Sequence, residues 1–465
     1  MVNVLKSAIV LKRKDVIFWA LVVAACIFRV ASDTTLPISY FLLAVCCFLG
    51  AKQVILAILF TWLFSMLNPG LGFGVSDFIF GKYIVFISAS ASMFFRSYFC
   101  GRESSCFFIS KTNFSIIILL LTLMAHSILF SMFTVLSILK LMLWGLVFCT
   151  LISAWNYVSP EERGRLNFTL FGVLALVLLV SLLFVSSPIG YLSNGSGFQG
   201  ILNQPQVFGV TAAIVSILFF SVLARRKNNL FAWFFFVFGL AMIFLSESRT
   251  AGVALILTIA ISLAISIFNS RGVFFQSFRG LGSPYSLFFG VLGAVVILSG
   301  YSFISSSLDG YLSKGGRDGQ FGGISESFES SRGFLLLKMA NNISENPLFG
   351  IGFGVGSDYE SFGVNVHQIF GVPISAPVEK GVLPIAIVEE FGVFFSASIF
   401  LFLFLAIFRA YNYGFYGISL VFIIYFLNMA EAMLFSVGGM GLLVLVFYSS
   451  IIVRRERFVT AEIVK

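Results

Sequence analysis

The side chains that could perform chemistry on a polar substrate are concentrated in one stretch of the sequence, residues 305–384. This stretch is rich in glycine and polar residues, and it supplies both cations and side chains that can accept a proton. Elsewhere the chain is largely apolar, so such chemistry has few other places to occur. The charged and titratable residues of the stretch are Lys314, Arg317, Asp318, Glu326, Glu329, Arg332, Lys338, Asp358, Glu360, His367, Glu379 and Lys380.

A second charged element, Ser246–Thr250, lies where an apolar run should leave a membrane. Arg249 in this element could simply anchor a helix end by extending toward the membrane surface. Two observations favour a functional role instead. Basic residues are disfavoured on the outer face, where we expect Arg249, and Glu247 and Ser248 accompany it in an otherwise apolar neighbourhood. We therefore expect Arg249 and the polar stretch to face one compartment and to form one site.

Arg332 stands in the first turn of a predicted, mostly apolar helix that Ser330 or Ser331 can cap and that reaches to about Ile343. We expect this helix to lie on the membrane surface or to pack on the bundle. A cation in the first turn opposes the helix dipole at a cost of about 0.3–1 kcal/mol, so helix stability does not explain Arg332. A helix start and a bidentate guanidinium both suit a phosphate group, which indicates anion binding. The alternative is an ion pair with Glu326 or Glu329.

Three residues are candidates for a catalytic base: His367, Glu379 and Lys380. A lone loop histidine is more often solvated than catalytic, whereas Glu379 and Lys380 precede an apolar run and should lie near the membrane surface. The glycine run 349–356 lacks the spacing and the strand–helix context of a phosphate-binding loop. We interpret it as a tight turn against the membrane surface.

The composition defines the elements that must position these residues. Of 465 residues, 59% are hydrophobic and 11% are charged, whereas soluble proteins carry roughly 25% charged residues. Apolar runs long enough to span a bilayer recur along the chain. We predict an all-α polytopic membrane protein with about 14 transmembrane helices, or 12 to 13 if the weak pair near 37–67 is re-entrant. The predicted spans are 16–32, 37–51, 53–67, 78–95, 113–135, 138–158, 167–187, 207–224, 230–246, 251–268, 285–303, 386–408, 415–430 and 433–453.

The predicted spans divide the chain into three parts. Residues 1–304 hold spans one to eleven, residues 305–384 form a large periplasmic loop with a surface helix, and residues 385–465 hold spans twelve to fourteen and a cytoplasmic tail. Every second junction between spans is basic, which places both termini in the cytoplasm and the long loop and Arg249 outside it. The same placement argues that the net charge of +9 does not indicate nucleic-acid binding.

Several short motifs resemble those of bacterial O-antigen ligases and Wzy-type polysaccharide polymerases. They are the S-E-S-R-T-A-G segment 246–252, Arg332 at a helix start, N-P-L-F-G-I-G-F-G at 346–354, and E-F-G at 390–392. The link G-I-L-N-Q-P-Q at 200–206 is similar to a further segment of the family. Together the motifs cover about residues 170–410 of the chain.

The resemblance implies a transferase that moves glycans from undecaprenyl pyrophosphate to an acceptor outside the inner membrane, with no metal and no cofactor. It implies that Arg249 and Arg332 hold the pyrophosphate and stabilise its departure. The family's histidine–asparagine pair before E-x-G is missing here, and Lys380-Gly381 stands near that position. His367, Glu379 or Lys380 would then supply the base.

We predict a polymerase of lipid-linked oligosaccharide repeats, for O-antigen, capsule or exopolysaccharide assembly. The alternatives are a ligase that transfers glycan to a lipid or protein acceptor, a flippase or exporter of lipid-linked sugars, and a structural subunit. A transporter should bury ionisable residues in mid-span, where this sequence shows only His126 and Glu431. The expected partners are the lipid-linked glycan and a chain-length regulator, in the bacterial inner membrane.

Overall fold

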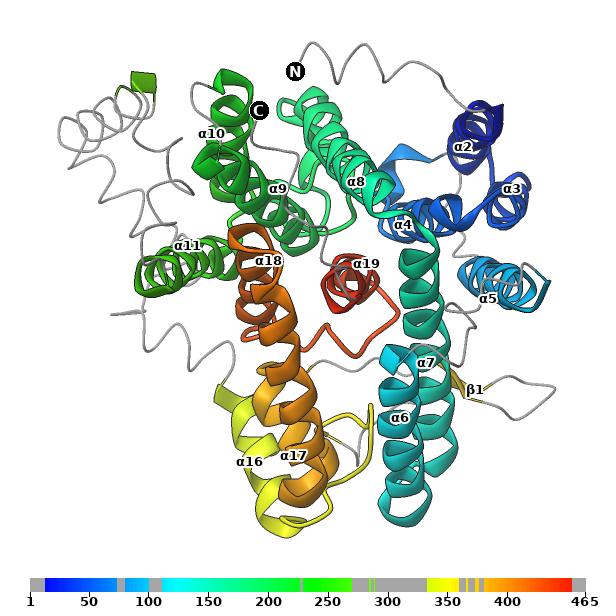
Figure 1. The fold of residues 1–465 in the computed structure, drawn as a ribbon, viewed down its shortest axis with the longest axis vertical. Coiled ribbons are helices and arrows are strands. Elements are labelled where there is room, and N and C mark those ends of the chain that lie inside the picture. Colours follow the sequence, from blue (N-terminus) through cyan, green and yellow to red (C-terminus); the bar gives the residue numbers. More distant parts are fainter. Residues whose placement is uncertain are drawn as a thin grey trace.

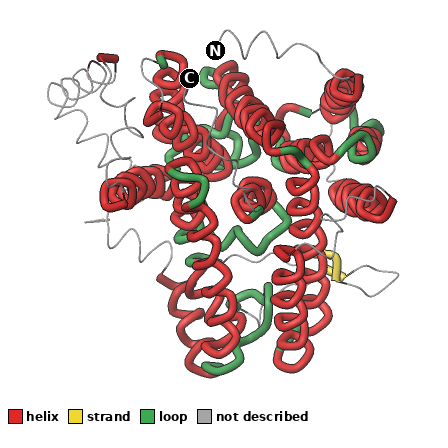
Figure 2. The backbone as a smooth tube through the Cα atoms, viewed as in Figure 1, coloured by secondary structure: helices red, strands yellow, loops and turns green. Residues whose placement is uncertain are grey.

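The computed structural model describes residues 13–72, 80–99, 111–225, 229–269, 284–285, 288, 333–358, 365–366, 373–375 and 380–453. Helices dominate these ranges, and a short antiparallel pair of strands, β1 (Asn365–Val366) with β2 (Pro373–Ser375), lies beside them (Figure 2). The strand pair falls within the stretch predicted to be a long loop. All further statements concern this described part of the chain.

Each predicted span coincides with a helix, except 285–303, which lies almost wholly outside the described residues. The helix predicted after Arg332 is present as α16 (Phe334–Glu345), and it packs against α17. The other helices are α2 (Arg13–Ala31), α3 (Leu36–Cys46), α4 (Ala51–Ser65), α5 (Gly81–Phe99), α6 (Lys111–Phe130), α7 (Thr134–Tyr157), α8 (Pro160–Ser181), α9 (Pro205–Arg225), α10 (Leu230–Leu245), α11 (Arg249–Asn269), α17 (Leu383–Tyr411), α18 (Phe415–Leu427) and α19 (Met440–Ile452).

Five of the described helices are long and apolar enough to cross a membrane: α7, α8, α9, α11 and α17. Six shorter apolar helices accompany them, α3, α4, α6, α10, α18 and α19. This combination makes the chain a multi-pass helical membrane protein. The total of about 14 spans stays a prediction, because a 13-residue helix such as α19 is about 20 Å long and the hydrocarbon layer is about 30 Å thick.

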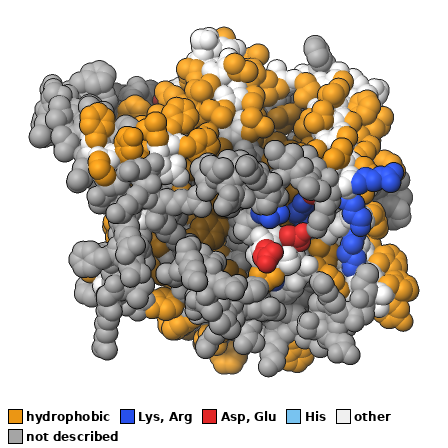
Figure 3. All heavy atoms as spheres, turned by 45° about the horizontal axis from the view of Figure 1, so that its top comes forward, with side chains coloured by type: hydrophobic (Ala, Val, Ile, Leu, Met, Phe, Trp, Pro, Cys, Tyr) orange, Lys and Arg blue, Asp and Glu red, His pale blue; other side chains and the backbone are white. Residues whose placement is uncertain are grey.

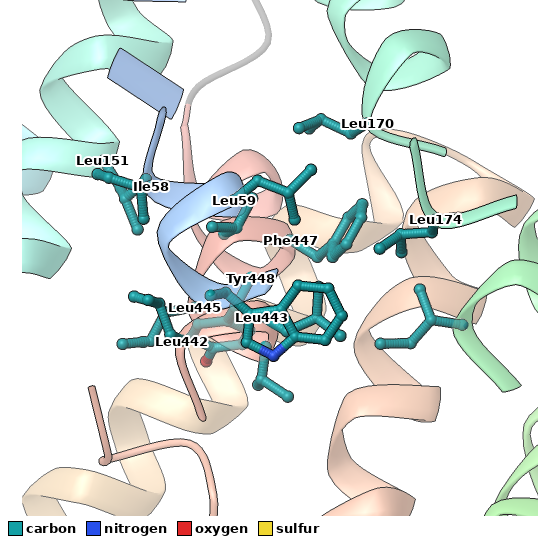
Figure 4. Close-up of a cluster of buried hydrophobic side chains, with 14 of the residues drawn as sticks. Ile58, Leu59, Leu151, Leu170, Leu174, Leu442, Leu443, Leu445, Phe447 and Tyr448 are labelled. Atoms are coloured by element: carbon teal, nitrogen blue, oxygen red, sulfur yellow. The ribbon is translucent and has the colours of Figure 1, made fainter. Parts of the chain in front are cut away.

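The core of the bundle is built around α19, which Figure 1 shows in the middle of the molecule. Its residues from Gly441 to Ile452 are buried, because the helix is apolar on every side and neighbours cover all its faces. Figure 4 shows Phe447 and Tyr448 of α19 among Ile58 and Leu59 of α4, Leu151 of α7, and Leu170 and Leu174 of α8. These long-range contacts hold the N-terminal and C-terminal helices together.

Contacts between helix ends agree with the predicted alternation of the junctions. Among junctions predicted to be external, the Asn68 amide donates to the carbonyls of Ile189 and Gly200 at 2.8 and 2.9 Å. Among junctions predicted to be cytoplasmic, Lys52 pairs with Asp15 at 2.7 Å. Junctions assigned to the same face therefore meet in space, whereas the compartment that each face meets stays a prediction.

The helices that concern the site lie together at one end of the bundle. Figure 1 shows α16 alongside α17, with α6 and α7 across from them in the lower part of the view. The turn between α6 and α7 approaches the segment that follows α16, where Met132 N–H donates to the Ile351 carbonyl at 3.1 Å. The sequence predicts both segments on the external face, and the structure brings them into contact.

Candidate functional site

Helix α17 is broken one third of the way along its length, at Gly392. This residue has φ 63° and ψ 176°, which are not helical values. A continuous helix would bond the carbonyls of Glu389 and Glu390 to the N–H groups of residues 393 and 394. The break separates these groups, so four backbone groups inside the bundle need other partners.

The segment 347–352 supplies those partners. Ile351 and Gly352 donate their N–H groups to the carbonyls of Glu389 and Glu390, both at 2.9 Å. In return, the carbonyls of Pro347 and Leu348 accept from the N–H groups of 393 and 394 at 2.9 and 3.4 Å. Two helical hydrogen bonds are thus replaced by four between segments far apart in the sequence. We call the segment 346–358 together with Lys380 and Glu389–Phe394 the α17 break.

Two glycines make this interlocking possible. A Cβ on Gly392 would lie 2.2 Å from the Leu348 carbonyl group, and a Cβ on Gly350 would lie 2.5 Å from the Glu389 carbonyl oxygen. Both glycines also have positive φ, 63° and 69°, which other residues adopt only with strain. The glycine run is therefore a turn, as predicted, but it turns against the opened backbone of α17.

The glycine run also contacts α6 and α7 through its carbonyl groups. Ser137 donates to Phe353 at 2.8 Å, Lys140 donates to Gly354 at 2.7 Å, and the ring of His126 bonds Phe349 at 2.6 Å. His126 is fully buried and packs between aromatic rings, including Phe391 and Phe395 of α17. This histidine, which the sequence left without a role, therefore holds the turn against the bundle.

The buried carboxylate of Glu389 accepts hydrogen bonds from three side chains. One belongs to α16, one follows the glycine run, and one precedes α17. Glu389 Oε2 accepts from Lys380 Nζ at 2.6 Å and from Ser357 Oγ at 3.1 Å, and its Oε1 accepts from Asn342 Nδ2 at 2.7 Å. The side chain has no exposed surface. A carboxylate buried to this degree is stable only when donors and a cation surround it, and here both are present.

The neighbouring carboxylate, Glu390, lies in a more open position. Its Oε1 is 3.4 Å from Lys380 Nζ, and its side chain keeps 12% of its surface exposed. It also accepts a hydrogen bond from the Gly354 amide, on the same segment whose carbonyl binds Lys140. Two lysines and two glutamates therefore form a compact group whose charges cancel. The face shown in Figure 3 has acidic and basic side chains together in a recess, with apolar side chains covering most of the helices above it.

Arg249 lies in a different region, which we call the α10–α11 turn (Ser246–Thr250). The turn packs on the link between α8 and α9: Phe198 N–H donates to the Leu245 carbonyl at 2.9 Å, and Ser196 Oγ donates to Glu247 at 3.0 Å. Glu247 is the one described non-glycine residue with positive φ, 53°. Arg249 is the first residue of α11 and is half-buried.

Only two of the five predicted site residues, Arg249 and Lys380, lie in the described part of the chain, and they lie in different regions. Arg332, His367 and Glu379 lie outside the described residues. Lys380 is described and buried, and it joins Glu389 and Glu390, whereas Arg249 stands with α9 and the 188–204 link. The expectation that Arg249 and the long loop form one site stays a prediction.

Five residues that take part in the polar contacts at the α17 break were not predicted as site residues: Lys140, Asn342, Ser357, Glu389 and Glu390. The sequence contained one signal, a pair of adjacent glutamates in an otherwise apolar run. Lys140 and both glutamates lie inside α7 and α17, and Glu431, which was expected in mid-span, follows the end of α18.

Lys140 and the two glutamates lie toward helix ends, so they are not the mid-span charges expected of a transporter. Glu390 is seven residues from the start of α17 and Lys140 is six from the start of α7, which places them about 10 Å along each helix. The bilayer centre lies about 15 Å from either edge of the hydrocarbon layer.

Within the described part of the chain, no group of three His, Cys, Asp or Glu residues could hold a metal ion.

Residues 234–372 match the family model described as O-antigen ligase. The matched region starts in α10 and includes the α10–α11 turn, α16 and the glycine run, so it contains Arg249 and Arg332. No curated protein matches the chain. The resemblance inferred from the short motifs is therefore confirmed over this region. The match ends before Lys380 and the two glutamates of α17.

Proposed function

We propose that this membrane protein transfers glycan chains from undecaprenyl pyrophosphate to an acceptor hydroxyl, and that it acts as a polymerase of oligosaccharide repeats. The observation that carries the proposal is the O-antigen ligase match over residues 234–372, which contains both arginines singled out by their placement. The family's ligase description supports transfer of a lipid-linked glycan. Polymerisation is the more specific part of the proposal, and ligation is its alternative.

In the proposed reaction, the acceptor oxygen attacks the sugar carbon that bears the pyrophosphate. The carbon–oxygen bond to the pyrophosphate breaks, and undecaprenyl pyrophosphate leaves with the bonding electrons. Arg249 and Arg332 would neutralise the charge that develops on the leaving group, since preorganised cations stabilise such charge best where water is excluded. Their guanidinium groups can bind phosphate oxygens in pairs, which a lysine cannot do.

A base is needed to accept the proton of the attacking hydroxyl, and His367, Glu379 and Lys380 are the candidates. Lys380 donates to a buried carboxylate at 2.6 Å and lies 3.4 Å from a second. It is therefore engaged as a cation, and a role as proton acceptor would require this pairing to open. The geometry shifts the preference toward His367 and Glu379.

The proposed reaction takes place outside the cytoplasm of a bacterial inner membrane, with both termini in the cytoplasm. A reporter enzyme that is active only after export, fused after Gly323, should be active in cells. Activity only of a cytoplasmic reporter at this position would contradict the proposed location of the site.

A deletion strain separates the two reactions. Loss of a polymerase should leave single repeats on undecaprenyl pyrophosphate, whereas loss of a ligase should leave long chains there. Mass spectrometry of the extracted lipid-linked glycans distinguishes these products. Single lipid-linked repeats that stay in the cytoplasmic leaflet and do not reach the outer leaflet would instead indicate a flippase.

A further inference from the structure

The two adjacent glutamates of α17 differ in what surrounds them. The Glu389 carboxylate accepts from three described side chains and has no exposed surface, whereas Glu390 keeps 12% of its side chain exposed. A carboxylate with its acceptor sites occupied and no access to solvent cannot reach a substrate. Its three bonds can, however, fix the segments that donate them.

Those donors come from three separate places in the chain. Asn342 is in α16, Ser357 follows the glycine run, and Lys380 precedes α17. The Asn342 amide uses its second N–H to bind the Ser357 carbonyl at 2.8 Å. Asn342 and Ser357 are themselves buried, 5% and 4% exposed. One carboxylate thus joins α16, the end of the glycine run and the connection into α17 in a single network.

A second connection between α16 and the same segment provides a useful contrast. Lys338 pairs with Asp358 at 2.5 Å, but their side chains are 27% and 48% exposed. Exposed ion pairs contribute little to stability, whereas removing one partner of a buried, fully bonded group leaves the others unsatisfied. Of these two polar connections of α16, the Glu389 network is therefore expected to contribute more to its position than the exposed pair.

We propose that Glu389 is a positioning residue that fixes α16 against α17, and through α16 the residues at its N-terminal end. The proposal rests on the proposed function in one respect: Arg332 immediately precedes this helix in the sequence and is assigned there to the pyrophosphate. A catalytic group displaced by about 1 Å can lose 10²-fold in rate. Loosening α16 should therefore reduce turnover although Glu389 touches no substrate.

The test exchanges an amide and a carboxylate between two positions without changing their shapes. Glu389→Gln removes the charge beside Lys380, and Asn342→Asp places a second carboxylate against Glu389. Each single change should lower glycan transfer roughly tenfold or more at matched protein amounts, because hydrogen bonds to charged groups are the strong ones. The double variant restores the amide–carboxylate pair between positions 342 and 389, although the Ser357 carbonyl loses the donor that Asn342 supplies. Transfer should therefore recover in part, above both single variants.

Two control variants separate this pairing from a general effect of charge. Asp358→Asn makes the same carboxylate-to-amide change in the exposed pair, and transfer should stay within about twofold to threefold of the wild type. Asn342→Asp combined with Glu390→Gln should show no recovery, since no bond joins those two side chains in the described structure. Recovery in that combination, or its absence in the Asn342–Glu389 exchange, would overturn the proposal.

Hydrogen–deuterium exchange of the full-length protein gives a readout that does not depend on glycan transfer. Amides of α16 should exchange faster in Glu389→Gln and return toward wild-type rates in the double variant, while those of α19 stay protected. Faster exchange in α19 as well would show that Glu389 supports the whole fold, and would overturn a positioning role. If deletion of the gene leaves all glycans unchanged, the proposed function fails, and the exchange data still decide whether Glu389 fixes α16.

Discussion

The α17 break and the α10–α11 turn both carry family-like motifs, but the structure encloses their charged residues to different degrees. At the break, Lys380 and Glu389 are almost fully buried and bonded to each other. At the turn, Arg249 is half-buried, and the neighbouring Glu247 accepts a hydrogen bond from an exposed serine. Both regions lie on the face predicted to be external.

This difference separates two uses of charge in an apolar protein. A buried pair whose charges cancel stabilises one arrangement of backbone segments and offers nothing to a ligand. A cation in the first turn of a helix opposes the helix dipole, so helix stability does not account for it, whereas anion binding does. Under the proposed function, the α17 break would provide the framework and the arginines would contact the substrate.

The largest expected effect comes from adding a methyl group at Gly392, where the backbone of Leu348 packs against α17. Gly392→Ala would place a Cβ 2.2 Å from the backbone of Leu348, at a φ of 63° that alanine adopts only with strain. We expect little folded protein in the membrane, measured by fluorescence-detected size exclusion. Gly172→Ala in α8 is the matched control, since a Cβ there meets nothing within 4 Å and should stabilise the helix by about 0.5–1 kcal/mol. Equal yields of the two variants would show that the break is not required.

The next effect concerns the arginines and leaves the fold intact. Arg249→Lys and Arg332→Lys keep the charge but lose the planar fork, so each should reduce transfer by roughly 10²-fold at normal expression. The double variant should cost little more than either single one, as happens when residues act as a unit. Arg409→Lys is the control, because Arg409 binds the Ile452 carbonyl at the junction predicted to be cytoplasmic. Near-normal glycan length in either arginine variant would contradict a role in pyrophosphate binding for that residue, and would leave a structural role such as a helix-end anchor or an ion pair.

Alanine variants of the base candidates should differ in whether they lower turnover or the amount of folded protein. His367→Ala or Glu379→Ala should lower turnover by about 10²–10⁴-fold if that residue accepts the proton, with protein amounts unchanged. Lys380→Ala should instead lower the amount of folded protein, because it leaves Glu389 buried without its cation, at a cost of roughly 3–5 kcal/mol. Comparing transfer per folded molecule separates the two effects. A large loss of turnover in Lys380→Ala, with stability unchanged, would restore it as the base.

The smallest effect is expected at the exposed edge of the α10–α11 turn. Ser196→Ala removes the 3.0 Å hydrogen bond to Glu247, and because this bond is open to water its loss should cost about 1 kcal/mol or less. Transfer should change by no more than a few-fold in an assay with lipid-linked donor. A loss as large as that of Arg249→Lys would mean that the turn itself, and not only its arginine, must be rigid.

Much of the fold was determined by the sequence alone. Long apolar runs predict helices, because a helix satisfies its backbone polar groups internally and a membrane offers no other partners. The described helices accordingly fall where the runs are, and the helix predicted after Arg332 appears as α16. The motifs around Arg249 and the glycine run were also sufficient to identify the family matched over residues 234–372.

The tertiary structure decided which polar residues meet. Asn342, Ser357 and Glu389 are separated by up to 47 positions, and no local pattern of helix propensity or hydrophobicity records such a contact. Lys140 was hidden in an apolar run, where a single lysine near a helix end has an ordinary explanation. Gly392 could be seen in the sequence as part of E-F-G. Only the tertiary structure explains why a glycine is needed there, because the backbone of 347–352 packs against it. The hydrogen bonds that stabilise the break come from this segment, which is about 40 residues away in the sequence.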